Sequence, residues 1–87
     1  MKIKQGFILR EVAGNCIVVA VGSAVKEFNG VINLNETGAF LWKKLQDGAD
    51  EEGLVQALLG EYEVEEDLAR KDVKAFVEKL QGAKLLI

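Results

Sequence analysis

The sequence predicts an α+β fold, a winged helix-turn-helix in which an N-terminal three-stranded antiparallel sheet is followed by three α-helices. The first third of the chain contains short β-branched runs separated by turn residues, whereas the remainder has apolar side chains at helical spacing. No proline, internal repeat or linker-like segment interrupts the pattern. We therefore expect a single domain over residues 1–87, with the helices on one side of a small sheet.

The first two strands are predicted at residues 7–12 and 16–21, joined by a three-residue hairpin loop, Ala13-Gly14-Asn15. The first run alternates apolar and polar side chains, as expected for a strand with one buried face. The second run is apolar on both faces. Its plain interpretation is a central strand covered on both sides; the alternative is a second face that meets a partner.

The third strand is predicted at residues 31–34. After Gly22-Ser23, residues 24–28 either continue the second strand past a bulge or form an irregular crossing. Asn29-Gly30 is a turn signal, because both residue types tolerate positive φ. Tight turns between successive strands favour a meander.

Side-chain chemistry marks the first two helices. Asn35 is suited to cap a helix over residues 36–46, and Gly48 to end it. Trp42, in this helix, is expected in the core. Asp50 is suited to cap a second helix, whose apolar stripe consists of Leu54, Val55, Leu58 and Leu59.

The third helix, predicted at residues 66–81, is the longest, and Gly82 is expected to end it. Its acidic residues lie near the start and its basic residues further along, as the helix macrodipole favours. Residues 85–87 form an apolar tail, expected to pack or to extend along the sheet. Asp72 lies beside the core stripe of this helix. From the residues alone it either caps or pairs with a neighbouring lysine, or holds a ligand.

Charge and composition bound the function. The chain has 87 residues and a net charge of −3, and residues 47–69 contain many Asp and Glu but no Lys or Arg. Such a segment is a solvated acidic face or a surface for a basic partner, and both weigh against nucleic-acid binding. No apolar run is long enough to span a membrane. With Cys16 as the sole cysteine, we expect a cytoplasmic protein without an internal disulfide.

The residues needed for common catalytic sites are missing. The sequence has no histidine, which excludes histidine-based triads and zinc sites, and it has no glycine-rich phosphate loop. The carboxylate pairs Glu51-Glu52 and Glu65-Glu66 lie at predicted helix starts, where they offset the macrodipole. We therefore expect no enzyme activity, no metal and no cofactor.

One string is more specific than these patterns. The segment Leu34-Asn35-Glu36-Thr37-Gly38-Ala39, followed by Leu41-Trp42 and later by Asp72-Val73 and Phe76, resembles the PqqD-like family. These small winged-helix domains recognise the leader peptides of ribosomally synthesised, post-translationally modified peptides. The resemblance extends from the first predicted hairpin to Leu86. It is compatible with PQQ biosynthesis or with another peptide product.

The resemblance implies a site. In the family, the leader peptide adds as an extra strand beside the third strand and packs against the third helix. Carried over by position, the strand edge is Val31, Ile32 and Asn33, and the helix wall is drawn from Asp72, Val73, Phe76 and Val77. The implied partners are a precursor peptide and a modifying enzyme, often a radical S-adenosylmethionine (SAM) enzyme.

Two alternatives remain open at this point. A winged-helix DNA-binding regulator would need a basic recognition face, yet the second predicted helix has no Lys or Arg, and acidic neighbours dilute the lysines of the third. A structural subunit could instead form a homodimer through the apolar second strand.

Overall fold

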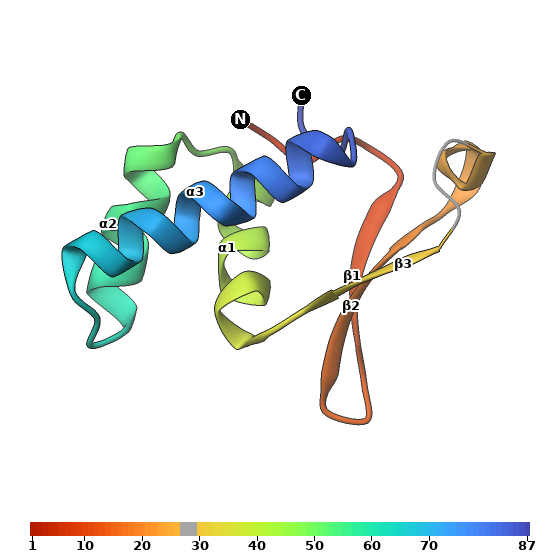
Figure 1. Ribbon diagram of the computed structural model, residues 1–87. Coiled ribbons are helices and arrows are strands. Elements are labelled where there is room, and N and C mark those ends of the chain that lie inside the picture. The colour runs from red at the N-terminus through yellow and green to blue at the C-terminus, as the bar shows by residue number, and fades with distance from the viewer. Residues whose placement is uncertain (27–29) are drawn as a thin grey trace.

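The computed structural model describes residues 1–26 and 30–87 (Figure 1). Its sheet is antiparallel with strand order β1-β2-β3, which confirms the predicted meander. The elements are β1 (Phe7–Val12), β2 (Asn15–Ala20), a short 3₁₀ helix η1 (Gly22–Lys26), β3 (Val31–Leu34), α1 (Glu36–Asp47), α2 (Glu51–Glu61) and α3 (Glu66–Gly82). Three strands followed by three α-helices confirm the predicted α+β fold.

The β1–β2 hairpin is tighter than predicted. Asn15 pairs with Val12, so only Ala13 and Gly14 form the loop. Their φ angles are 51° and 82°, and two successive positive φ values match the right-handed twist of the flanking strands. The three-residue loop was the wrong prediction because Ala13 adopts a left-handed conformation that alanine seldom takes.

The segment after β2 also differs from one prediction. Residues 22–26 form η1, so the second strand does not continue past a bulge there. The remainder of the 24–28 segment, and Asn29 of the Asn29-Gly30 turn signal, lie outside the described residues.

The predicted helix caps of α1 and α2 are confirmed. The Asn35 side-chain oxygen accepts a hydrogen bond from the Gly38 amide at 2.7 Å, and Asp50 accepts one from the Gly53 amide at the same distance. Gly48 is the C-cap of α1 as expected, with its amide donating to the Leu45 carbonyl. Each cap satisfies backbone groups that a helix end leaves without partners.

The C-terminal tail packs against the start of the chain and not along the three-stranded sheet. Leu85 is fully buried, and its carbonyl accepts a hydrogen bond from the Lys4 amide at 2.7 Å. The Ile87 amide donates to the Lys2 carbonyl at 2.9 Å. This pairing holds the two termini together at the end of α3. Helix α3 ends at Gly82, one residue further than predicted.

The core lies between the sheet and the helices, which gather on one side of it (Figure 1). The sheet contributes Phe7, Val18, Ile32 and Leu34, and Trp42 is fully buried beneath them in α1, as predicted. The helices add Leu41, Leu45, Leu54, Leu58, Val73, Phe76, Val77 and Leu80. Among the described residues, no helix is long and apolar enough to cross a membrane.

The opposite face of the sheet is not covered by the described residues. Antiparallel register places Ile8, Ile17, Val19 and Val31 on this face, with Val12 and Val21 at its ends. Val12, Val21 and Val31 are 53%, 38% and 54% exposed. On β2 itself, Ile17 and Val19 are half-buried on this face, whereas Val18 on the face toward the helices is fully buried, so the two faces of β2 are not covered equally.

Candidate functional site

The outer edge of β3 is free within the described residues, because β3 pairs only with β2. The direction of its backbone groups follows from the register. The Val21 amide donates to the Gly6 carbonyl, so even-numbered residues of β1 turn their backbone groups toward β2. The same alternation continues across the sheet. The backbone N–H and C=O groups of Ile32 and Leu34 therefore point toward β2, and those of Val31 and Asn33 point outward.

A contact from α3 agrees with this assignment. The Lys79 ammonium donates to the Asn33 carbonyl oxygen at 3.4 Å. An oxygen that α3 can reach must point away from β2, because β2 lies on the other side of the strand. Val31 and Asn33 therefore offer outward N–H and C=O groups to any chain that approaches this edge.

A groove of about 480 Å³ lies beside this edge. One wall is the end of β3 and the first turns of α1, and the other wall is α3. The lining residues are Asn33, Leu34, Asn35, Thr37, Gly38 and Leu41 on the first wall, and Asp72, Ala75, Phe76 and Lys79 on the second. Leucine and phenylalanine side chains form its apolar part, and amide, hydroxyl and charged groups lie around them. This combination is typical of a site that binds a peptide by both backbone and side chains.

The structure brings three of the predicted site residues to this groove. Asn33, Asp72 and Phe76 line it, the last with only 9% of its surface exposed. Val31 lies two residues before Asn33 on the same free edge, and its side chain is on the open face of the sheet. The backbone groups of Val31 therefore belong to the free edge, whereas its side chain belongs to the open face.

The other three predicted residues lie in the core. Ile32 faces the helices, and Val73 and Val77 are almost completely buried. Their side chains support the groove from beneath without lining it. Lys79 was missed in the sequence, although its spacing offered a signal. Residues at i, i+3, i+4 and i+7 share one helix face, and starting from Asp72 that series ends at Lys79.

Two charged side chains, those of Asp72 and Lys79, line the groove. The Asp72 side chain makes no hydrogen bond or ion pair within the described part of the chain, so the predicted alternative of a pairing lysine is not observed there. Lys79 contacts only a backbone carbonyl among the described groups. Both side chains are solvent-exposed and available to a ligand.

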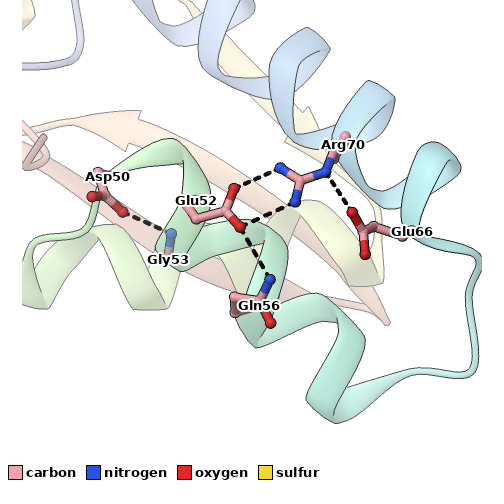
Figure 2. Close-up of polar contacts among 6 residues, drawn as sticks. All are labelled: Asp50, Glu52, Gly53, Gln56, Glu66 and Arg70. Carbon is pink, nitrogen blue, oxygen red and sulfur yellow. Dashed lines mark hydrogen bonds and ion pairs between the residues drawn. The ribbon is translucent and has the colours of Figure 1, made fainter.

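An ion-pair network holds α3 against α2, away from the groove. Figure 2 shows Arg70 donating to both carboxylate oxygens of Glu52, and to Glu66 at 3.0 Å. The hydrogen bonds from Arg70, and a further one from Gln56, lower the pKa of Glu52. The network helps to fix the position of the helix that forms the second wall.

A second hollow, of about 570 Å³, lies on the other side of the β3–α1 junction. Its lining includes Glu11, Glu36 and Glu61 with Tyr62. Partial burial, followed by the negative charges of Glu36 and Glu61, raises the pKa of Tyr62. This hollow borders the β1–β2 hairpin and not the free edge of β3, so it lies apart from the outward groups of Val31 and Asn33.

Comparison of the sequence with protein families finds one match. The model of the family described as coenzyme PQQ synthesis protein D (PqqD) matches residues 8–86. The chain belongs to the PqqD family. The match includes all three strands, the groove and α3, so the residues that line the groove lie within the part the PqqD family shares. No curated protein sequence matches the chain.

Two solved structures share the fold of this PqqD family member. One is described as TbiB1 in complex with the TbiA(β) leader peptide; it has a TM-score of 0.77 and 22% identity, covering 99% of this chain and 94% of the other. The second is described as lasso peptide synthetase B1 complexed with the leader peptide. Its TM-score is 0.74 and its identity 24%, covering 97% of this chain and 93% of the other.

Proposed function

We propose that this chain is a non-catalytic peptide-binding module. It captures the leader of a ribosomally synthesised precursor peptide by adding it as a strand to β3, and it presents the peptide to a modifying enzyme. The outward backbone groups of Val31 and Asn33 beside the groove carry this proposal. Edge groups supply affinity that is independent of sequence, and groove side chains supply specificity.

The relatives support the same function. Both similar structures are described as complexes with leader peptides, and PqqD family membership places this chain among proteins of peptide-modification pathways. Under this proposal the enzyme partner is a radical SAM enzyme, and the protein works in the cytoplasm. The partner performs the chemistry, which is consistent with a sequence without histidine and with a single cysteine.

The test is an amide-resolved NMR titration with the leader of a precursor encoded next to this gene. We expect the largest shifts in residues 31–34 and in the groove face of α3. The variant Asn33→Pro should abolish binding, because proline removes an outward N–H while leaving the amides that pair with β2. Asn33 is exposed at an edge, so the sheet should tolerate this change.

Glu11→Pro is the matched control. By the same alternation, the Glu11 amide points outward at the opposite edge of the sheet, on β1. This variant should bind the leader like the wild type. Equal binding by all three proteins, or shifts confined to the β1 edge, would contradict strand addition at β3.

The DNA-binding alternative finds no support in the charges. Helix α2 carries no basic residue, and Arg70 of α3 is engaged by Glu52 and Glu66. Self-association is favoured by one observation, the exposed valines on the open face of the sheet. It is compatible with peptide binding, since the face and the β3 edge are different surfaces.

A further inference from the structure

The helix wall of the groove carries opposite charges at its two ends. Asp72 and Lys79 are seven positions apart, which is two helical turns or about 10.5 Å along the axis. Phe76 lies between them. The Lys79 end adjoins Asn33, and the Asp72 end therefore lies toward the first turns of α1, where Thr37 and Leu41 line the groove.

Lys79 has a second property. Its ammonium contacts the Asn33 carbonyl, which is one of the acceptors that an added strand would use. A peptide amide that pairs with this acceptor competes with the ammonium, whose contact is long at 3.4 Å, and the ammonium is then free to turn to a partner on the peptide. The lysine side chain is long and exposed, so it can swing toward the peptide without disturbing the core.

We infer that Asp72 and Lys79 together read the order of charges in the peptide. This inference rests on the proposed function. A basic side chain of the peptide pairs with Asp72, an apolar one lies over Phe76, and an acidic one pairs with the Lys79 that strand addition displaces. In the free protein, Lys79 covers the edge of β3, as lysines do at many sheet edges.

Strand geometry fixes the spacing of these three side chains. Alternate side chains of a strand point to the same face, so those directed at α3 recur every second residue. The recognised segment therefore reads basic, any, apolar, any, acidic. We place the basic residue first because antiparallel pairing, the commoner kind, sets the start of the peptide beside the end of β3, near Asp72. Long charged side chains accommodate the difference between strand and helix spacing.

The test is a selection from a displayed library of random twelve-residue peptides. The baits are the wild-type protein and a charge-exchanged variant, Asp72→Lys with Lys79→Glu. The wild type should enrich basic-any-apolar-any-acidic, and the variant should enrich the same pattern with the two charges exchanged. A synthetic peptide from the wild-type pool should lose about tenfold in affinity when its own charges are exchanged, and the variant should restore it.

The matched control exchanges a second pair on the same helix, Lys71→Glu with Glu78→Lys. These residues are also seven apart and exposed, but they do not line the groove. This control should select the wild-type pattern. The emission of the fully buried Trp42 reports whether each variant is folded.

Two failures are distinguishable. In the first outcome, the wild type enriches peptides that Asn33→Pro does not, but these peptides show no charge order or the reverse order. That result overturns this inference and leaves the proposed function standing. If wild type and Asn33→Pro enrich the same peptides, or neither enriches any, the proposed function itself fails.

Discussion

The side-chain oxygen of Asn35 accepts a hydrogen bond from the Gly38 amide at 2.7 Å, and both residues line the groove. This contact joins the end of β3 to the start of α1. Gly38 is closely surrounded, because a β-carbon there would lie 3.2 Å from the Asn35 oxygen and 3.4 Å from the Leu34 side chain. The same residues therefore cap the helix and shape the peptide-facing wall.

Removing this cap should destabilise the protein. Asn35→Ala leaves the Gly38 amide without its acceptor, and we expect the free energy of unfolding to fall by about 1 kcal/mol in urea denaturation. Asn35→Ser keeps an oxygen acceptor at the same position and should lose much less. If the two variants were equally stable, the hydrogen bond would contribute little.

Two glycines should respond in opposite directions to alanine. Gly60 lies within α2 with open space around it, so Gly60→Ala should raise the free energy of unfolding by about 0.5–1 kcal/mol. Gly6 has a φ of +96°, and a β-carbon there would lie 2.6 Å from that of Ala24. Gly6→Ala should therefore lower the stability clearly. Parallel denaturation curves test both, and a loss of stability with Gly60→Ala would contradict this packing of α2.

The Arg70–Glu52 pair should contribute to stability only when Glu52 is ionised. Its folded pKa is lowered from the ordinary 4.5, chiefly by the Arg70 hydrogen bond. A lowered carboxyl pKa stabilises the fold above the ordinary value, and this contribution disappears as the pH falls through the lowered one. Arg70→Ala should thus lower the thermal midpoint slightly at pH 7, and the difference should shrink below pH 4.5.

Thermal unfolding of both proteins at a series of pH values measures this difference. Lys71→Ala is the control, because Lys71 is an exposed cation on α3 that forms no ion pair among the described groups. If the thermal midpoint of the wild type exceeded that of Arg70→Ala by the same amount down to pH 3, packing of the arginine stem, and not its charge pairing, would stabilise the fold.

The helices could be predicted closely because their ends are encoded in local side chains. Asn35 and Asp50 each place an oxygen three residues before the amide that needs it, and this relation is visible in the sequence. The hairpin was predicted less closely, because the left-handed conformation of Ala13 depends on strand pairing. The residue type alone gives no sign of it.

The site was predicted only in part, since the groove depends on how α3 is rotated against the sheet. Asp72 and Phe76 line the groove, whereas Val73 and Val77 turn into the core. A helix with apolar residues over a wide arc allows several rotations, and tertiary packing selects one. Lys79 was overlooked for a related reason, because a lysine beside the core stripe is usually only solvated, and its contact with Asn33 spans 46 positions of the chain.

The open face of the sheet should govern self-association. Val12, Val21 and Val31 are the large apolar residues described on this face that are more than a third exposed. The triple variant with threonine at these positions keeps β-branched side chains, so its thermal midpoint should stay close to that of the wild type. In sedimentation at high protein concentration, we expect the wild type to show a rising average mass and the threonine variant to remain monomeric.

The variant Asn33→Pro distinguishes self-association through the open face from self-association through the β3 edge. A dimer formed by pairing two β3 edges needs the outward amide of Asn33, whereas one formed by the open face does not. If the average mass falls with Asn33→Pro and not with the threonine variant, association occurs at the edge and competes directly with the leader peptide. If it falls only with the threonine variant, the edge remains available, and a self-associated protein should bind one leader peptide per chain.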